Sequence, residues 1–329
     1  MRILIGVVFY NKSELYINNF LNRLSIISNC SIYAVFNSSV DINLITKYSN
    51  IYFSFNDTNQ GSAGGFFEIL AYARDIAEID YLLTIDDDLS FSQEGLLAAI
   101  KNYNDLSKLH GRIILLGFRS TLLKIKLICT GYINNKVSNY CGGFFRFNLS
   151  HLIYYFDYLF CKIMSWPRHY NEFPELINNC YWGGMLISKS ALFDVLLHEK
   201  RLFLYKDDVQ FSYNFSSMGG KIFVDRNFMI IDKGASWIRH KGFWGFLVPE
   251  LYSNSVRLYY SFRNTIYIQF NTPKISHKVS SFFSGFFYLP VLLIIIFFRF
   301  ANFIYIMHSI RDALFFILNK NSKFNDFKP

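Results

Sequence analysis

The first 118 residues alternate short apolar runs with segments of helical periodicity, and no other feature of the chain constrains the fold as strongly. The pattern predicts strands at 3–10, 31–37, 51–55, 81–85 and 112–118, and helices at 13–27, 65–77 and 93–103. Parallel neighbours are joined only through crossovers, and helices usually form them. The sequence therefore predicts an α/β fold with a mostly parallel sheet and helices on both of its faces.

Polar side chains follow several of these strands at the point where each strand ends. Asn11 follows the first strand, Asn37 closes the second, the loop "NQGSAGG" (59–65) follows the third, and three aspartates follow the fourth. In open α/β sheets, ligands bind at the carboxyl ends of the strands. The sequence therefore predicts a binding site at this edge of the sheet.

Asp86, Asp87 and Asp88 form the most acidic stretch of a chain whose net charge is +9. Carboxylates this close raise the pKa of one another unless a cation lies between them. Side chains at i and i+2 of an extended segment point the same way, so Asp86 and Asp88 can share one Mg²⁺ or Mn²⁺ while Asp87 faces elsewhere. The alternative is a solvated turn that caps the next helix.

The glycines of "NQGSAGG" allow a close approach to the backbone. A helix that begins near Gly65 would offer free N–H groups to a phosphate or to a sugar. The spacing matches neither a P-loop nor the dinucleotide-binding fingerprint. A plain loop at the start of a helix is therefore an equally good interpretation.

Three later motifs carry side chains that could take part in catalysis or in binding. Of the acid pair Asp207 and Asp208, one carboxylate could deprotonate an incoming hydroxyl, and His240 could complete the ligand shell of a metal. Trp182, beside two glycines, could form a flat platform for a sugar. The alternatives are a surface turn, a structural histidine and a core tryptophan.

The tail differs from the rest in composition. Residues 282–298 carry no charge, although Pro290 interrupts them, and Arg299 ends the run. This length only reaches the lower limit for a spanning helix. A span would also place the basic C-terminus opposite a cytosolic catalytic domain, against the positive-inside rule. We therefore expect helices in the plane of the membrane interface, with a true span or a helix buried against the domain as alternatives.

Aromatic residues make up 19% of the chain and charged residues 17%, which suggests apolar surface in need of a partner. The positive net charge favours an anionic partner such as a nucleotide or a membrane face. The basic residues are scattered and no nucleic-acid-binding motif is recognised, so we expect no nucleic acid partner. Five cysteines without a C-x-x-C pattern predict reduced thiols in a cytosolic protein.

The ordered set of motifs resembles the family 2 glycosyltransferases with a GT-A fold. It includes "NQGSAGG", "DDD", "WGGM" and "DDVQF", and the resemblance covers residues 1 to about 270. Within the family it looks most like the galactofuranosyltransferase and rhamnosyltransferase-like branch, whose features include a Y-x-x-R-N motif. Here that motif is Tyr260, Arg263 and Asn264.

The resemblance implies a role for each matching residue. The metal ligands would be Asp86, Asp88 and His240, and the catalytic pair would be the base Asp208 with Asp207 as a sugar or acceptor contact. The nucleotide-sugar donor would be bound by Asn11, Asn37, Asp57, Asn59, Gly61, Gly64, Gly65, Asp87, Trp182 and Arg263. Gln210 stands where the family pattern has an acid, and an amide cannot share the work of the base.

We therefore expect an inverting, metal-dependent hexosyltransferase with a nucleotide-diphosphate sugar donor. By resemblance it would move galactofuranose from UDP-galactofuranose to a polyprenyl-diphosphate-linked glycan, in the synthesis of O-antigen, as part of lipopolysaccharide, or of another surface polysaccharide. The alternatives are a dTDP-rhamnose-dependent transferase and a non-catalytic, membrane-bound scaffold of a polysaccharide assembly complex.

The expected domains are a GT-A catalytic domain at 1–245 and a helical, membrane-associated segment at 246–329. The nucleotide-sugar half of the catalytic domain would span 1–118 and the acceptor half 119–245. The protein would lie at the cytoplasmic face of the inner (plasma) membrane as a peripheral or monotopic protein.

Overall fold

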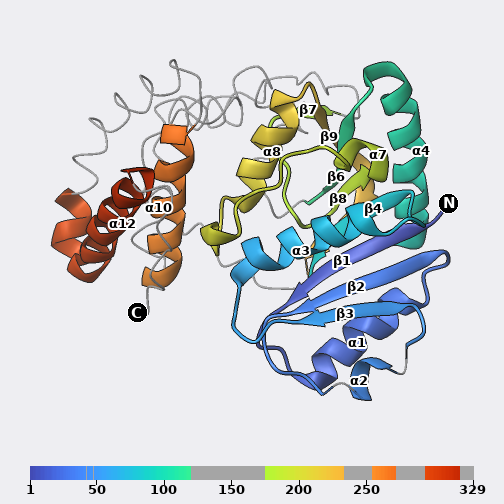
Figure 1. Cartoon of the computed structure of the whole chain (residues 1–329), viewed down its shortest axis with the longest axis horizontal. Coiled ribbons are helices and arrows are strands. Elements are labelled where there is room, and N and C mark those ends of the chain that lie inside the picture. Colours follow the sequence, from blue (N-terminus) through green and yellow to red (C-terminus); the bar gives the residue numbers. More distant parts are fainter. Residues whose placement is uncertain (42, 47, 120–174, 233–253, 272–292, 319–329) are drawn as a thin grey trace, which may run out of the picture. The chain divides into compact units, whose positions relative to one another are not determined.

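The computed structural model of the chain describes residues 1–41, 43–46, 48–119, 175–232, 254–271 and 293–318 (Figure 1). The expected metal ligand His240 and the first part of the uncharged tail, 282–292, lie outside these ranges. The chain divides into two compact units. The first comprises Met1–Cys129, Tyr170–Phe203 and Asp207–Ala235, and the second comprises Thr130–His169, Leu204–Lys206 and Ser236–Pro329.

The first unit is built on an eight-stranded sheet with the order β3-β2-β1-β4-β8-β6-β9-β7. The strands are β1 (Ile3–Phe9), β2 (Cys30–Phe36), β3 (Ile51–Phe55), β4 (Tyr81–Asp86), β6 (Ile113–Phe118), β7 (Glu175–Ile177), β8 (Met185–Ser188) and β9 (Lys221–Met229). Strands β3, β2, β1 and β4 are mutually parallel, as are β6 and β9, whereas β8 runs antiparallel to both β4 and β6. The predicted mostly parallel α/β sheet is confirmed.

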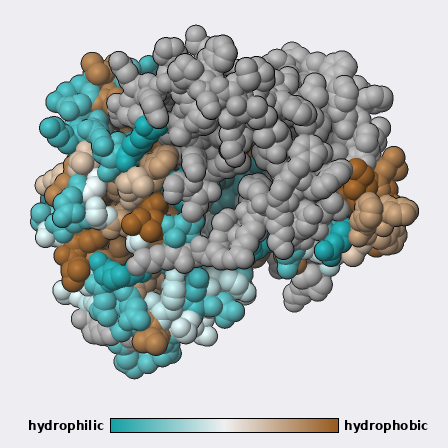
Figure 2. Space-filling model, turned by 180° about the vertical axis from the view of Figure 1, so that it is seen from behind, coloured by the Kyte–Doolittle hydropathy of each residue, from teal (hydrophilic) through white to brown (hydrophobic). Residues whose placement is uncertain are grey.

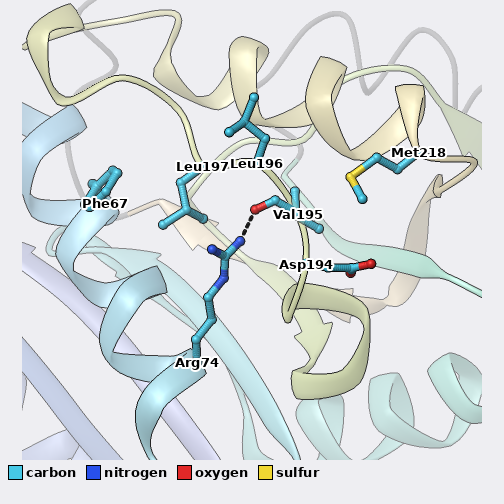
Figure 3. Close-up of a pocket in the computed structure, with 7 residues that line it drawn as sticks. All are labelled: Phe67, Arg74, Asp194, Val195, Leu196, Leu197 and Met218. Carbon is cyan, nitrogen blue, oxygen red and sulfur yellow. Dashed lines mark hydrogen bonds between the residues drawn. The ribbon is translucent and has the colours of Figure 1, made fainter.

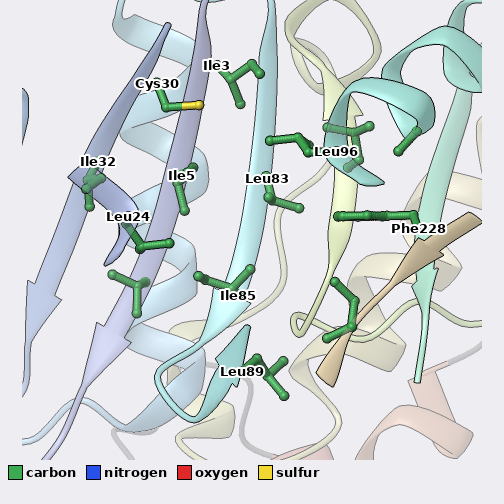
Figure 4. Close-up of a cluster of buried hydrophobic side chains, with 14 of the residues drawn as sticks. Ile3, Ile5, Leu24, Cys30, Ile32, Leu83, Ile85, Leu89, Leu96 and Phe228 are labelled. Carbon is green, nitrogen blue, oxygen red and sulfur yellow. The ribbon is translucent and has the colours of Figure 1, made fainter. Parts of the chain in front are cut away.

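Helices cover both faces of the sheet, as the sequence predicts. They are α1 (Glu14–Ser25), α2 (Asn43–Thr46), α3 (Gly61–Asp75), α4 (Gln93–His110), α7 (Lys189–Leu192) and α8 (Asp207–Ser217), with a 3-10 turn η2 at Lys200–Leu202. Side chains such as Ile5 of β1 and Leu83 of β4 share one core with Leu24 of α1 and Leu96 of α4 (Figure 4). Val8 of β1 points to the opposite face, toward α3. Because both faces are buried, β1 is apolar throughout rather than alternating.

Helix α3 begins at Gly61, earlier than the predicted start at residue 65. Gly61 has φ +66°, and a Cβ there would lie 1.9 Å from the carbonyl oxygen of Phe203. Further along the helix, a Cβ on Gly65 would lie 2.7 Å from both methyl carbons of Val8. The glycines of this loop therefore allow the helix to lie close to β1 and to the backbone near Phe203.

The second unit contains two described helices, α10 (Ser255–Asn271) and α12 (Phe300–Leu318), and residues 293–298 are helical as well. The two helices pack through an apolar core that includes Phe262 and Ile266 of α10 and Ile306 and Ala313 of α12. The long apolar helix of the described residues thus follows Arg299 in the sequence.

Helix α12 has an unusual distribution of polarity. Polar Asn302 and Ser309 are buried. Apart from Arg311, whose side chain is 67% exposed, the exposed large side chains are apolar: Phe300, Ile304, Met307, Leu314, Phe315 and Leu318. The exposed apolar atoms of this segment are seen as brown surface in Figure 2. By length and composition α12 could cross a bilayer, and only 28% of its most apolar 18-residue stretch is buried. This polarity suits a helix that contacts lipid.

A Gly65→Ala substitution tests the close contact between α3 and β1. The added methyl group would overlap Val8, and overpacking of this kind costs about 1–3 kcal/mol of the free energy of unfolding. Gly95→Ala is the matched control, because Gly95 lies near the start of α4, where a Cβ would come no closer than 3.0 Å to the hydroxyl of Ser92 and would make its other contacts at ordinary van der Waals distance. We expect this control to change stability by no more than about 0.5 kcal/mol. Equal losses in thermal or urea unfolding would contradict the assignment.

Candidate functional site

The carboxyl ends of the parallel strands meet at one edge of the first unit. In the register of the sheet, Val8 of β1 pairs with Asp86 of β4, and Phe9 pairs with Phe36 of β2. Just beyond these pairs, the N–H of Asn11 donates to the hydroxyl of Ser38 at 3.2 Å. The structure therefore brings the ends of β1, β2 and β4, with the polar residues that follow them, to the same edge.

Lys12, which follows Asn11, contacts the acidic triplet. Its Nζ lies 3.2 Å from Oδ1 of Asp87, and the hydroxyl of Tyr16 donates to the carbonyl oxygen of Asp87 at 3.0 Å. Lys12, in the loop before α1, therefore holds the side chain of Asp87, and Tyr16 of α1 holds its backbone carbonyl. Asp86 makes a different contact, described next, so the neighbouring aspartates have separate partners.

Arg119, directly after β6, binds Asp86. Its Nη1 donates to Oδ2 of Asp86 at 3.3 Å, and its Nη2 donates to Oδ2 of Asp232 at 3.0 Å. Asp232 belongs to β10 (Ile231–Asp232), which pairs antiparallel with β5 (Leu89–Ser90), the strand that follows the triplet. One guanidinium thus bridges carboxylates from β4 and β10, and neither Arg119 nor Asp232 is among the predicted site residues.

Gly183 of the "WGGM" motif makes room for this ion pair. A Cβ at Gly183 would lie 2.5 Å from Nη1 of Arg119 and 2.6 Å from Oδ2 of Asp86. Thr84 of β4 fixes the segment, because its hydroxyl donates to the carbonyl of Trp182 at 2.6 Å and its carbonyl accepts from Gly184 at 2.8 Å. The motif therefore lets the chain pass beneath the carboxylate at the end of β4.

The carboxylates at this edge are strained electrostatically. Burial raises the pKa of Asp86 to about 6, Asp88, Asp87 and Asp207 raise it too, and Arg119 lowers it. Burial likewise raises the pKa of Asp87 to about 6, against the opposing effect of Lys12. In the described part of this edge, the carboxylates named here outnumber the two cations that contact them. Negative charge therefore remains for a further cation to neutralise.

A hard divalent ion fits the chemistry of this edge, because Mg²⁺ and Mn²⁺ accept carboxylate oxygens such as those of Asp86 and Asp88. Among the residues that the structure describes, no group of three or more His, Cys, Asp or Glu side chains has the geometry of a metal site. The expected third ligand, His240, lies outside those residues. Asp86 is paired with Arg119 instead.

Trp182 is buried rather than displayed as a platform. It is 5% exposed, its ring stacks on Phe66 with centroids 4.9 Å apart, and it also contacts His198. Its indole Nε1 donates to Oδ2 of Asp207 at 2.7 Å. The prediction of an open sugar platform is therefore wrong, because neighbouring side chains already cover the ring. Trp182 holds a carboxylate instead.

Asp207 is 2% exposed and is the first residue of α8. A helix N-terminus stabilises a negative charge, as does the hydrogen bond from Trp182. Asp207 also raises the pKa of Asp86, so the second acid pair lies within electrostatic reach of the triplet. The structure thus brings together two acidic motifs that are about 120 residues apart in the sequence.

Asp208 is partly exposed, and its carboxylate accepts from the N–H of Val209 at 2.7 Å. Gln210, which departs from the family pattern, binds Glu199. Its Oε1 accepts from the N–H of Glu199 at 2.8 Å and its Nε2 donates to Oε1 of Glu199 at 3.4 Å. A carboxylate at position 210 could not donate this second bond and would be repelled by Glu199. The amide therefore fits its surroundings.

Arg263 lies in α10 of the second unit and is 2% exposed. Its guanidinium stacks on Tyr260, and its Nε donates to the side chain of Asn264 at 2.9 Å. Asn264 in turn donates to the carbonyls of Leu204 and Tyr205, both at 2.8 Å. The predicted role of Arg263 in binding the donor is therefore replaced by a structural one, because the guanidinium is buried against Tyr260 and Asn264.

The backbone turn that Asn264 holds is strained. Phe203, Tyr205 and Lys206 have φ of 62°, 65° and 70°, a region that costs residues with a Cβ about 1–2 kcal/mol each. The chain continues directly into Asp207 and the catalytic pair of the prediction. Two bonds from one buried amide therefore stabilise the strained turn that precedes the acid pair.

The loop after β3 is held by internal hydrogen bonds. Asn37 is buried, donates to the carbonyl of Gly61 at 2.9 Å, and accepts from Asn56 and from the N–H of Gln60. Asn59 accepts from the N–H of Gly61 at 2.9 Å. The side chain of Asn37 is thus occupied within the protein, contrary to its predicted role at the nucleotide.

The backbone N–H groups at the start of α3 are also less available to a ligand than the prediction required. The N–H groups of Gly61, Ala63 and Gly64 all bond to protein oxygens. Gly64 and Gly65 are buried in the helix, and their expected position near the donor sugar stays a prediction. Asp57, in contrast, is exposed in the same loop.

A separate pocket of about 570 Å³ is lined by Phe67, Arg74, Asp194, Val195, Leu196, Leu197 and Met218 (Figure 3). The guanidinium of Arg74 donates to the carbonyls of Leu192 and Val195. These bonds satisfy carbonyls at and beyond the end of α7. The pocket shares no lining residue with the acidic edge, and Arg74 has a structural role in it.

No protein-family model and no curated protein matches this chain. Similar solved structures include S. aureus TarS, with a TM-score of 0.45, 16% identity, and coverage of 99% of this chain and 44% of that chain. TarS 1–349 has a TM-score of 0.40 and 14% identity, with coverage of 100% of this chain and 76% of that chain. A197 from STIV has a TM-score of 0.37 and 14% identity, with coverage of 71% of this chain and 87% of that chain.

This chain spans less than half of the longer TarS structure. All three TM-scores lie below 0.5 and all identities below 25%.

The raised pKa values of Asp86 and Asp87 predict how stability depends on pH. In the folded state both lie near 6, above about 3.9 for an unfolded aspartate. Their contribution to stability is therefore full below about pH 4 and is lost as the pH rises through 6. Asn mimics the neutral acid, so in EDTA we expect the melting temperature of Asp86→Asn, relative to wild type, to increase from pH 5 to pH 7.

The matched control is Asp75→Asn at the exposed end of α3, for which this relative melting temperature should not change with pH. If Asp86→Asn behaves like Asp75→Asn across this range, the carboxylate of Asp86 is not destabilised in the folded protein.

Proposed function

We propose that this chain is a metal-dependent, inverting glycosyltransferase that uses a nucleoside-diphosphate sugar. The observation that carries the proposal is the convergence of two acidic motifs at the carboxyl edge of the sheet, where Asp207 lies within electrostatic reach of Asp86. A transferase of this kind needs one acidic group to bind the cation and another to accept a proton. The ordered sequence motifs supply the same two groups.

The residues of the chain would divide the work between them. A bound divalent ion would neutralise charge on the departing diphosphate. Asp86, Asp88 and His240 would hold that ion. Asn11 and Asp57, which lie in the loops after β1 and β3, would contact the nucleoside. Asp208 would accept the proton of the acceptor hydroxyl during a single displacement, and Asp207, fixed by Trp182, would orient the sugar or the acceptor.

The donor we propose is UDP-galactofuranose, with dTDP-rhamnose as the alternative, and the acceptor is a polyprenyl-diphosphate-linked glycan of a surface polysaccharide. A screen of nucleotide sugars for metal-dependent hydrolysis distinguishes the donors. If no nucleotide sugar is hydrolysed and no nucleotide binds with a metal ion, the chain is a scaffold rather than an enzyme.

We also propose that the protein associates with a membrane at its cytoplasmic face. The support is the distribution of polarity on α12, where Asn302 and Ser309 are buried and the exposed large side chains, Arg311 excepted, are apolar. A helix of this kind buries its apolar face in lipid. A lipid-linked acceptor would explain why a transferase stays at that surface.

Asp208→Asn tests the base. The amide keeps the shape of the side chain but cannot take up a proton, so we expect transfer to the acceptor to fall by roughly 10²–10⁴-fold. Binding of the donor nucleotide with Mn²⁺, measured by calorimetry, should stay within about threefold of wild type, because this carboxylate acts on the acceptor. Asp75→Asn is the control and should leave both measurements unchanged. A variant at Asp208 that transfers sugar at the wild-type rate would disprove this role.

The membrane assignment is tested on side chains that are exposed to a similar extent. Replacing Phe300, Phe315 and Leu318 of α12 by serine removes apolar side chains that are each worth about 1.5–3 kcal/mol when fully buried. We expect flotation with vesicles that contain anionic lipid to fall more than about tenfold. Phe193→Ser with Leu196→Ser is the control, because these side chains of the first unit are as exposed. Equal flotation of all three proteins would overturn the assignment.

A further inference from the structure

Arg119 has no part in the function proposed above, although it lies at the centre of the acidic edge. Its side chain is 12% exposed, and that of its partner Asp232 is 6% exposed. Two of its nitrogens are bonded to carboxylates, at 3.3 Å from Asp86 and 3.0 Å from Asp232. Its Nε is buried and has no hydrogen-bond partner within the described residues. The guanidinium therefore holds the carboxylates without using all of its donors.

The ion pair of Arg119 and Asp86 is incompatible with a cation at the same oxygen atom. Oδ2 of Asp86, which accepts from Arg119, is one of the oxygens that a divalent ion at the triplet would use. Like charges at such a distance repel strongly in a partly buried site. A cation at the triplet therefore requires the guanidinium to leave Asp86.

A guanidinium released from Asp86 has a suitable new partner. Arginine presents several donors in a fixed fork that matches the oxygens of a phosphate. A nucleoside diphosphate at the triplet would bring such oxygens to the edge that Arg119 already occupies. The unpartnered Nε gives the fork a donor that the two carboxylates do not satisfy.

We infer that Arg119 is a diphosphate-binding residue that exchanges partners. In the ligand-free protein it neutralises Asp86 and Asp232, and in the loaded protein it releases Asp86 and binds the diphosphate of the donor. This inference rests on the proposed function, since it assumes a divalent ion and a nucleoside diphosphate. It adds that Arg119 weakens binding of the divalent ion when the ion binds alone. When the ion and the diphosphate are both present, Arg119 strengthens binding of the diphosphate.

The Arg119→Gln variant tests the inference, because its affinities for Mn²⁺ and for the nucleotide should change in opposite directions. Without nucleotide, loss of the competing charge should tighten Mn²⁺ binding, followed by electron paramagnetic resonance, by about tenfold. At saturating Mn²⁺, loss of the fork should weaken binding of UDP or dTDP, followed by calorimetry, by about tenfold. Arg119→Lys keeps the charge and loses the fork, so it should bind Mn²⁺ like wild type and the nucleotide more weakly.

Lys12→Gln is the matched control, because Lys12 provides the other cation at the triplet but contacts Asp87. It should change either affinity by less than about threefold, since its charge lies on the other aspartate. If Lys12→Gln reproduces both changes, the effect is general electrostatics and the inference fails. It also fails if Arg119→Gln weakens both ligands or changes neither.

Two further measurements keep the outcomes distinct. Arg119→Gln leaves buried Asp232 without this cation, so the double variant with Asp232→Asn restores the balance of charge and should show the same opposite changes once thermal unfolding confirms that it is folded. If wild type binds neither Mn²⁺ nor either nucleotide, the proposed function itself is wrong. If wild type binds both and the Arg119 variants match it, only the exchange of partners is wrong.

Discussion

The first unit depends on how the partly buried carboxylates at the end of β4 are neutralised. Desolvation raises the pKa of Asp86 and Asp87, and each is held by one cation. Lys12 comes from the loop after β1, and Arg119 from the end of β6. Because these groups follow strands that end at a common edge, the topology of the sheet determines which charges can meet. The chemistry proposed for the chain is a consequence of that arrangement.

The sequence predicted the parts of this arrangement that depend on local pattern. The strands of the parallel half agree closely with those observed, since runs buried on both faces are continuous and apolar. The rule that ligands bind at strand ends pointed to Asn11 and the triplet, which the structure brings to one edge, and applied to the fifth predicted strand it would also have pointed to Arg119. Asp232 gave no such signal, because its position depends on the pairing of two short strands, β5 and β10.

The wrong predictions share one physical cause. Each gave a ligand-binding role to a side chain that the folded protein already buries or holds in its own contacts. Trp182 is covered by aromatic side chains, and Arg263 is buried against Tyr260. A motif records which residue types occur together, whereas burial decides whether a side chain can reach a ligand, and only tertiary contacts determine burial.

Gly183 has a consequence for the spacing of the charges at this edge. Even the smallest side chain at this position would overlap a guanidinium nitrogen and a carboxylate oxygen at the same time. An alanine here could keep both charged partners only if the ends of their side chains moved apart. The absence of a side chain at position 183 thus helps to set the distance between the two charges.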